Sequence, residues 1–420
     1  MKPTTKTIHL MLLCFFCSIT TYGADLFVYP NAQSPDYADI QSAIDASSNG
    51  DNIYIDTASF IGNIDIDKTL SFYPLHKGGM YTINGAVTLT LTNNRTIYIQ
   101  GLNGGGVSSN MNSGNSSDSA SVILNGCKFS SSVNIDHGNS IRSFIYYSEF
   151  NSSLSIDACE LIGNTFHGSV TTTPNPDSKP NSPSIKIYAN YFDVNSVQLY
   201  INYPYYANIH IANNNFIQNT AVSSQNINMS TGSSSSKADV VIIENNIIKN
   251  SNSSYSNSTQ QVYIGYADFL FIRNNYFDLM YTSGYSNYRG IYTTSIGIYD
   301  FQYNFTNISD SYFNEAYGTI QTISNNTYNT NLYYNTTSQN NLGVVSTSAG
   351  INAGSQLPEC RDINNTQNDI GTYGGPHSWS NYHNSSSSMA QILDLEIPYY
   401  QIVLPGTVIN FKSKAIHKNE

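Results

Sequence analysis

A short pattern of apolar and polar residues recurs through the middle of the chain. Apolar residues alternate with polar ones, an asparagine follows, and an apolar residue closes the unit. Four copies are IKIYANYF (185–192), IHIANNNF (209–216), VIIENNII (241–248) and LFIRNNYF (270–277), with partial copies at 161–166 and 322–328. Alternation with a period of two is typical of a strand with one buried face. Each copy therefore predicts a short strand followed by a turn.

The spacing of the copies predicts a solenoid. Most intervals between closing apolar residues run from the twenties to the low thirties, the length of one coil in a repeat protein. A doubled last interval predicts one further coil around residues 301–306. In such stacked coils the turn asparagines form a structural ladder of side-chain amides, as identical residues do in cross-β stacks. The predicted ladder consists of Asn164, Asn190, Asn214, Asn246, Asn275 and Asn326.

The start of the patterned region predicts a cap. Residues 37–49 place Ile40, Ala43, Ile44 and Ser47 on one face at helical spacing, and alternating strands follow. A short amphipathic helix at this point would cover the open end of a solenoid, which otherwise exposes a sheet edge and apolar core. Alternating apolar residues at 394–414 predict a last small β element.

Three strings resemble a known superfamily. The opening YADIQSAIDASSNGDNIYID (37–56), the turn asparagines, and NDIGTYGG (368–375) resemble the right-handed parallel β-helix, or pectin-lyase-like, superfamily and its bacterial secreted and surface members. The resemblance covers residues 37–328. It implies an all-β right-handed solenoid with a short N-terminal helical cap and a C-terminal β closing segment. We expect a signal peptide at 1–23, an N-terminal strand and capping helix at 24–50, the β-helix at 51–345 and the closing segment at 346–420.

The first residues predict export. Lys2 and Lys6 precede an apolar stretch at 10–19, and Thr21 and Gly23 supply the small residues of a cleavage site after Gly23. An uncleaved membrane anchor is the less favoured alternative, because the apolar run is about half of the ~20 residues that span a bilayer. We expect a secreted or cell-surface protein with no transmembrane segment after signal cleavage.

The amino-acid composition limits the classes of molecule that this protein could bind. The net charge is −11, only 11% of residues are charged, and no basic stripe could neutralise phosphates, so a nucleic-acid partner is excluded. Abundant Tyr and Asn suit neutral polar partners such as glycans. Cys127, Cys159 and Cys360 are too few and too widely spaced for a disulfide framework or a zinc site, so we interpret them as small buried hydrophobes.

One pair of carboxylates offers possible chemistry. FSSSVNID (129–136) and FNSSLSID (150–157) are copies one coil apart, which places Asp136 about one strand spacing, ~4.8 Å, from Asp157. His137 and Glu160 are close in sequence and complete the candidate catalytic set. Such a pair could hold Ca²⁺ or act as a retaining glycosidase pair. The alternative is two turn aspartates in water.

A second candidate site is aromatic. QLYINY (198–203) and QVYIGY (261–266) share a pattern that points Tyr200 and Tyr263 away from the core, with Tyr203 and Tyr266 beside them. Outward tyrosines offer an apolar face with a polar tip, which suits sugars and protein interfaces. The alternative is ordinary β-propensity with stacking between coils.

Two pairs of oppositely charged residues have a structural role in our interpretation, not a catalytic one. Glu244 and Arg273 occupy equivalent repeat positions, as do Lys249 and Asp278, which predicts ion pairs between neighbouring coils.

Two functional hypotheses follow. The first is a non-catalytic secreted or surface protein that contacts an extracellular polysaccharide or a surface protein through tyrosines and loops. The second is a polysaccharide lyase or glycoside hydrolase that uses Asp136 and Asp157. The chain has no Asp-Asp pair, no Gly-His-Gly and no Arg-Ile-Lys string, and only 17 Lys and Arg, which favours the first hypothesis. A purely structural spacer is a third possibility, because one fold serves many roles.

Overall fold

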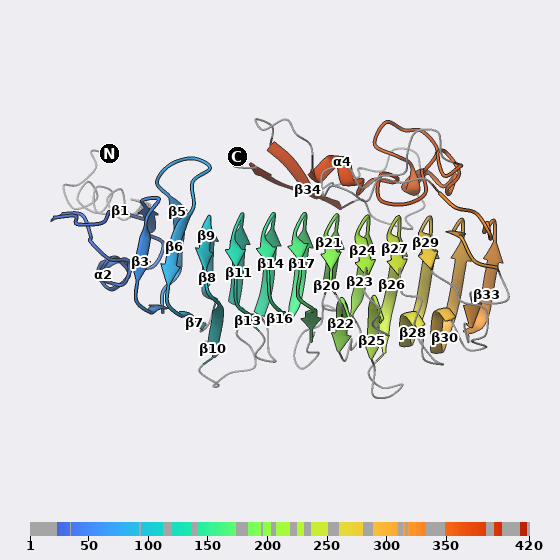
Figure 1. Cartoon of the computed structure of the whole chain (residues 1–420), viewed down its shortest axis with the longest axis horizontal. Coiled ribbons are helices and arrows are strands. Elements are labelled where there is room, and N and C mark those ends of the chain that lie inside the picture. Colours follow the sequence, from blue (N-terminus) through green and yellow to red (C-terminus); the bar gives the residue numbers. More distant parts are fainter. Residues whose placement is uncertain are drawn as a thin grey trace, which may run out of the picture.

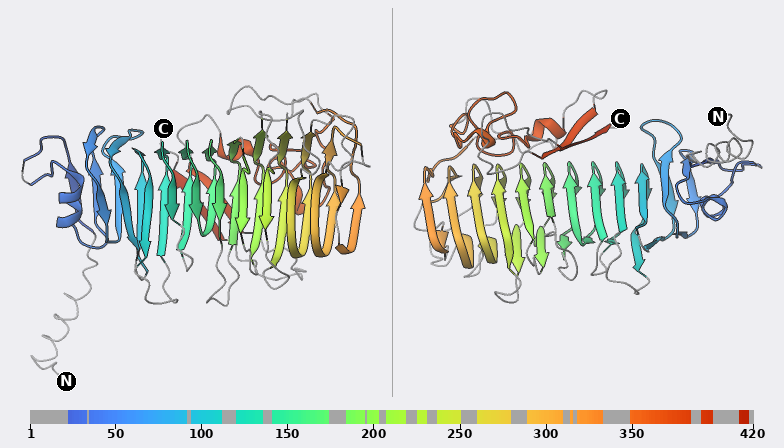
Figure 2. Two further views of the ribbon diagram at one scale, coloured as in Figure 1. Left: turned by 60° about the horizontal axis from the view of Figure 1, so that its bottom comes forward. Right: turned by 180° about the vertical axis from the view of Figure 1, so that it is seen from behind.

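The chain is an elongated parallel β-solenoid (Figures 1 and 2). The computed structural model describes residues 23–33, 35–91, 94–111, 120–135, 141–173, 184–194, 196–202, 207–218, 225–230, 237–250, 260–279, 289–309, 314–315, 318–332, 349–383, 390–396 and 412–417. Each coil passes through three faces and then advances by one strand. The parallel pairing confirms the predicted all-β solenoid.

The described strands sort by face. The first face contains β1 (Asp25–Val28), β2 (Asn52–Ile55), β5 (Leu70–Pro74), β8 (Thr96–Gln100), β11 (Ala120–Asn125), β14 (Ile141–Tyr146), β17 (Ala158–Ile162), β20 (Ser184–Tyr188), β23 (Asn208–Ala212), β26 (Ala238–Glu244) and β33 (Gly318–Ser324). The second face contains β3 (Ser59–Ile61), β6 (Tyr81–Asn84), β9 (Leu102–Gly104), β12 (Lys128–Phe129), β15 (Glu149–Phe150), β18 (Thr165–Phe166), β21 (Tyr191–Asp193), β24 (Asn215–Gln218), β27 (Ile247–Asn250), β29 (Tyr276–Leu279) and β31 (Phe305–Thr306). The third face contains β4 (Ile64–Ile66), β7 (Val87–Leu91), β10 (Val107–Met111), β13 (Val133–Ile135), β16 (Leu154–Ile156), β19 (Val170–Thr172), β22 (Leu199–Asn202), β25 (Ile227–Ser230) and β32 (Asn314–Glu315). Two long strands, β28 (Gln260–Arg273) and β30 (Arg289–Gln302), run from the third face into the first and join these faces into one sheet.

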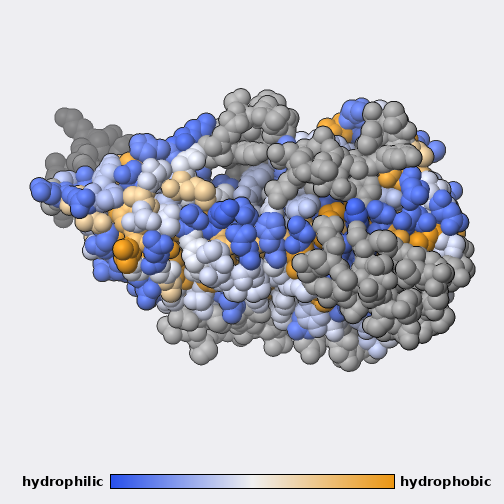
Figure 3. Space-filling model, viewed as in Figure 1, coloured by the Kyte–Doolittle hydropathy of each residue, from blue (hydrophilic) through white to orange (hydrophobic). Residues whose placement is uncertain are grey.

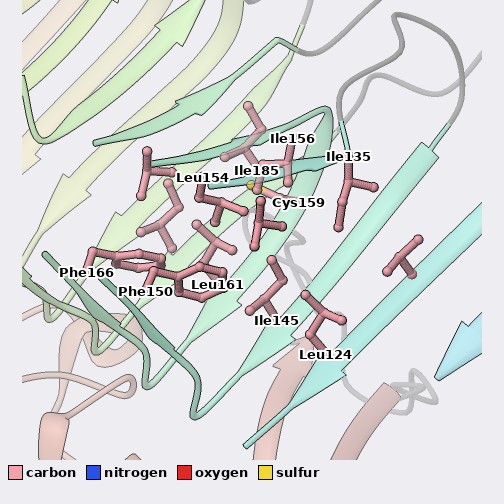
Figure 4. Close-up of a cluster of buried hydrophobic side chains, with 14 of the residues drawn as sticks. Leu124, Ile135, Ile145, Phe150, Leu154, Ile156, Cys159, Leu161, Phe166 and Ile185 are labelled. Atoms are coloured by element: carbon pink, nitrogen blue, oxygen red, sulfur yellow. The ribbon is translucent and has the colours of Figure 1, made fainter. Parts of the chain in front are cut away.

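The alternating side chains fill the interior. Ile135 pairs in register with Ile156, as their copied strings predict, and both are fully buried. Figure 4 shows such side chains pointing between the faces, with Phe150 and Phe166 lying parallel. Five phenylalanines of the second face form a column with ring centroids 4.6 to 5.2 Å apart: Phe129, Phe150, Phe166, Phe192 and Phe216. The three cysteines of the described chain are free and buried, as predicted.

The asparagine ladder is confirmed. Asn164, Asn190, Asn214, Asn246 and Asn275 each donate a side-chain N–H to the amide oxygen of the next ladder residue at 3.0 Å. The coil predicted around residues 301–306 supplies Asn304, which links Asn275 to Asn326. The amides also bind backbone groups, since the Asn214 side chain donates to the carbonyl of Ile187 at 2.7 Å.

The residue before each ladder asparagine makes the turn possible. Asn213, Asn245 and Asn274 have φ of 58°, 55° and 58°, the left-handed region that asparagine tolerates. The sequence pattern placed the ladder asparagine at the turn, and the structure gives the left-handed geometry to the residue before it. The buried ladder amide binds the backbone groups of the turn. The residue before it adopts the left-handed geometry and points outward.

A second set of buried amides lies between the second and third faces. Asn226 donates to Gln198 at 2.7 Å, and Asn250 donates to Gln218 at 2.6 Å and to Gln261 at 3.0 Å. The glutamines that begin QLYINY and QVYIGY are therefore interior residues. Their shared position in the two strings is explained by burial, with the side-chain oxygens of Gln198 and Gln261 accepting from Asn226 and Asn250.

The predicted N-terminal cap is confirmed. Helix α2 (Ile40–Ala46) begins at Asp39, whose carboxylate accepts a hydrogen bond from the N–H of Ser42 at 2.8 Å. The apolar face of α2 joins the solenoid core through Ile40, Ala43 and Ile44. Lys68 binds the last helix carbonyls at 2.6 to 2.9 Å and holds the cap on the next coil.

The described C-terminal residues lie along the side of the shaft. We call residues 349–383 the strap; it contains a 3₁₀ turn (Pro358–Cys360) and α4 (Trp379–Tyr382). Figures 1 and 2 show it beside the middle and later coils, with β34 (Ala390–Glu396) and β35 (Lys412–His417) paired antiparallel beyond it. These two strands provide the predicted small β element. The strap does not cover the last described coil, where the inward-facing Ile323 is 48% exposed.

The ladder makes one stability prediction. Asn214→Ala would leave several buried backbone and amide groups unpaired, at about 1–3 kcal/mol each. We expect the free energy of unfolding, measured by urea denaturation, to fall by about 3 kcal/mol. The matched control is Asn84→Ala at an exposed position, with an expected change below about 0.5 kcal/mol. Equal losses in the two variants would contradict the role assigned to the ladder.

Candidate functional site

The predicted carboxylate pair is only partly described. Asp136 and His137 lie outside the described residues, so the structure does not place them beside Asp157. The strands that precede the two aspartates are in the predicted register, from Val133 opposite Leu154 to Ile135 opposite Ile156. The catalytic and calcium-binding assignments of this pair stay predictions.

Asp157 and Glu160 are both buried. Asp157 is 2% exposed at the corner between the third and first faces, and its backbone carbonyl accepts a 2.7 Å hydrogen bond from Thr172. Glu160 is 7% exposed on the outer side of β17, between Phe144 and Lys186 of the adjoining strands. Within the described residues, no group of three or more His, Cys, Asp or Glu is arranged to hold a metal ion.

The predicted tyrosines of the third face point outward. Tyr200 and Tyr263 are partly exposed, while the apolar residues on either side of each are fully buried. They are not neighbours, because Asn228 of β25 lies between them in register. Tyr266 is partly exposed in the middle of β28, and Tyr203 lies outside the described residues.

Tyr263 has a different aromatic neighbour. Its ring stacks on Tyr292 of β30 with centroids 5.7 Å apart and planes 15° from parallel. The Tyr263 hydroxyl also lies 3.4 Å from the hydroxyl of Thr294. The third face therefore presents a short aromatic platform of two stacked rings.

A longer aromatic row lies on the first face of the N-terminal coils. Phe27, Tyr54 and Tyr73 stack in order, with centroids 5.5 and 5.4 Å apart and planes within 24° of parallel. Tyr98 continues the row at 5.3 Å from Tyr73 with a tilt of 38°. All four rings are partly exposed. We call these four residues the aromatic row.

Amide groups border the end of the aromatic row. The Tyr98 hydroxyl donates to the side-chain oxygen of Gln100 and accepts from the side chain of Asn125, both at 3.1 Å. Polar side chains of Asn52 and Ser71 occupy the adjoining outward position on β2 and β5. The row thus combines apolar ring edges with hydrogen-bonding groups at its margins, an arrangement suited to polar ligands with apolar faces.

Sequence reasoning missed the aromatic row. Its members lie in coils of unequal length, and Tyr98 is diagonal to Tyr73 because the register pairs Tyr98 with Ser71. The alternation in DNIYID and LSFYP contained the available signal, since Tyr54 and Tyr73 occupy the outward positions of strands that share a register.

Further along the same face, the strap covers the outer surface. The outward asparagines of three successive coils bind it. The Asn213 side chain donates to the carbonyl of Thr372 at 2.9 Å, and the Asn245 side chain donates to that of Asp369 at 2.8 Å. Asn274 accepts from the N–H of Ser355 at 2.8 Å.

The NDIGTYGG string is the part of the strap that needs glycine. A methyl group on Gly374 would overlap the carbonyl oxygen of Asp369 and the side-chain amide of Asn245, so only glycine fits there. Gly375 has a φ of 73°. The string that resembles bacterial surface β-helix proteins is therefore the sequence that docks the strap on its asparagine row.

An apolar cluster fixes the rest of the strap. Trp379 and Tyr382 are each 1% exposed and pack with Tyr146, Ile162 and Tyr188 of the first face. His383 stacks on Trp379 at 3.9 Å and its ring N–H donates to the carbonyl of Ala189.

A charged cluster lies under the strap. Arg273 and His210 contact the two oxygens of Glu244 at 2.8 and 2.7 Å, which confirms the predicted Glu244–Arg273 pair. Lys249 and Asp278 are opposite each other in register, as predicted. Burial alone would raise the pKa of Glu244, but Arg273 and His210 outweigh it and hold that pKa well below its usual range.

His377 of the strap completes the cluster. Its ring stacks on Tyr188 at 4.2 Å and meets His210 edge-on at 5.2 Å, while the Tyr188 hydroxyl contacts the other nitrogen of His210 at 2.9 Å. Burial and then the neighbouring His210 lower the pKa of His377 to about 3. His377 is therefore neutral when the strap is docked.

Comparison with protein-family models, curated proteins and solved structures gives no match in any of the three. The parallel solenoid is shown by its strand pairing, and the pectin-lyase-like superfamily stays an expectation from the sequence motifs. No helix in the described part of the chain is both long and apolar enough to cross a bilayer.

The buried His377 predicts that acid weakens strap docking. A released His377 takes up a proton below its ordinary pKa of 6.5, whereas the docked residue stays neutral down to about 3. The docked state is therefore fully favoured above pH 6.5. Below pH 6.5, the ratio of docked to released strap falls by up to about tenfold per pH unit. Trp379 is the only tryptophan in the chain, so its fluorescence should shift to the red as the pH falls from 7 to 5.

The control is His377→Phe, which keeps a ring on Tyr188 but cannot titrate, and it should flatten this pH dependence. Burial raises the pKa values of Asp362 and Asp369 in the strap, which favours docking at lower pH, so the difference between the two proteins isolates His377. An identical pH profile in the variant would contradict the assignment.

Proposed function

We propose that this protein is a secreted or cell-surface binding shaft that holds an extended polysaccharide along the aromatic row of its first face. The observation that carries the proposal is the regular stack of Phe27, Tyr54, Tyr73 and Tyr98, with spacings of 5.3 to 5.5 Å. Each ring is partly exposed, so one edge of the stack is open to a ligand.

The spacing of the row follows from the fold. Rings at equivalent outward positions of adjacent parallel strands are separated by about one strand spacing. Such a ladder of rings advances along the shaft in steps comparable to the size of one sugar unit, so successive sugars of an extended chain can each meet a ring. The flat scaffold holds the rings in place before binding, which lowers the entropic cost of association.

Polar groups lie at the margins of the aromatic row. The Tyr98 hydroxyl with Gln100 and Asn125 forms a fixed set of donors and acceptors beside the rings. Sugar hydroxyls need such partners, while the C–H faces of the sugar rings need apolar contact. In Figure 3 the hydrophobic residues of the visible face form small patches among hydrophilic ones, a surface suited to polar partners.

Tyr263 and Tyr292 form a second, smaller platform on the third face. Their two stacked rings match the role predicted for the outward tyrosines of that face. We assign them the weaker contact, because two rings offer less area than four.

A polysaccharide lyase or glycoside hydrolase remains the alternative. Of its four candidate residues the structure describes two, Asp157 and Glu160, which are 2% and 7% exposed. A carboxylate that protonates or attacks a polymer must reach it within hydrogen-bonding distance. The burial of both groups favours the binding hypothesis over the catalytic one.

The proposal is tested by incubating the mature protein with a panel of polysaccharides and scoring both retention and new chain ends. We expect retention of at least one polymer without cleavage. Tyr54→Ala with Tyr73→Ala should weaken retention about tenfold, since each ring contributes roughly 0.5–1.5 kcal/mol.

The matched control is the double variant Tyr263→Ala with Tyr292→Ala, which removes a stacked tyrosine pair from the third face. It should weaken retention less than the first-face variant. Greater loss in the control would move the main site to the third face. New chain ends that disappear in Asp157→Asn would make the protein an enzyme and overturn the proposal.

A further inference from the structure

Two carboxylates lie at the margins of the aromatic row. Asp25 of β1 is exposed and accepts a 2.9 Å hydrogen bond from Asn52, the residue two positions before Tyr54. Asp56 follows β2, two positions after Tyr54, and its side chain is 31% exposed. Both acids are therefore open to solvent near the same ring. The negative charge of Asp25 acts on that ring, since burial and then Asp25 raise the pKa of the Tyr54 hydroxyl.

The charge around the row is not compensated by nearby basic groups. Residues 24–111 contain eight Asp and only three Lys and Arg, namely Lys68, Lys77 and Arg95. Lys68 donates to three carbonyls at the end of α2. Arg95 donates to the carbonyl of Thr90. Among the described residues, the imidazole of His76 lies 3.6 Å from Asp56 and makes the one ion-pair contact to either marginal acid.

From this arrangement we propose that the aromatic row selects a polysaccharide whose sugars carry free amino groups. This inference rests on the proposed function and names the chemical class of its ligand. An ammonium group at the open edge of the stack gains from Asp25 and Asp56 by charge-assisted hydrogen bonds. A neutral sugar gains only the contact with the ring edges, and a uronic acid polymer is repelled by the same carboxylates.

The test compares one sugar chain with and without its amines. A glucosamine hexamer and the same hexamer after complete N-acetylation are titrated into the mature full chain by calorimetry, in mildly acidic buffer. We expect the free-amine form to bind at least about threefold more tightly, a gain within the range of one exposed charge pair. Added salt should reduce that difference, because the carboxylates are exposed.

Two double variants separate the marginal acids from the general negative charge. Asp25→Asn with Asp56→Asn should remove the preference for the free-amine hexamer and leave binding of the N-acetylated hexamer unchanged. Asp65→Asn with Asp67→Asn removes the same charge at exposed positions away from the row and should keep the preference.

Each outcome decides the inference. Equal affinity for the two hexamers, or loss of the preference in the Asp65 and Asp67 variant, would overturn it. If both hexamers bind equally well and their binding depends on Tyr54 and Tyr73, only the amino-sugar class is rejected. The proposed polysaccharide-binding function then still holds. Absence of binding to every polymer would reject the proposed function itself.

Discussion

Every coil of a parallel solenoid buries a sharp turn whose backbone donors and acceptors need partners away from water. Here a column of asparagine amides provides them. Each amide binds a backbone carbonyl of the preceding coil and the side-chain amide of the next coil, as Asn214 does with Ile187 and Asn246. The column therefore fixes the register of one coil on the next. All rows of outward side chains depend on that register, including the aromatic row and the asparagines that bind the strap.

The outward rows have two different fates along the first face. In the N-terminal coils, the row of Phe27, Tyr54, Tyr73 and Tyr98 is partly exposed. In the later coils, the outer surface is covered by the strap, which packs Trp379 on Tyr146 and Ile162 and places His377 on Tyr188. The strap, a segment of the same chain, thus covers the later coils of this face. We interpret the other half as the surface that receives a ligand.

The repeat could be predicted from sequence because its cause is local. Alternation sets the inward residues, and the buried asparagine recurs at a fixed place, so the ladder from Asn164 to Asn275 was visible. Asn304 was less visible because Thr306 occupies the closing position that is apolar in the other copies. The strap could not be placed, since its contacts join Asn213 and Asn245 to residues more than 120 positions away. The paired asparagines at 213–214, 245–246 and 274–275 were the available signal.

The candidate sites were harder to predict for a related reason. Which outward residues meet depends on the length of each coil, and loops change that length. Tyr200 and Tyr263 were correctly expected to face outward, yet the intervening strand of Asn228 separates them. Tyr54 and Tyr73 touch because the register pairs them directly, a fact that alternation alone does not reveal. The buried state of Asp157 and Glu160 also depends on neighbouring coils and was not readable from their own strings.

We propose that a polymer lies along the shaft on successive rings of the aromatic row. Calorimetry with oligosaccharides of increasing length would test this placement. Affinity should rise with each added sugar until the oligomer spans Phe27 to Tyr98, and then stay constant. An affinity that is already maximal for a single sugar, or that never depends on length, would contradict a row that binds an extended chain.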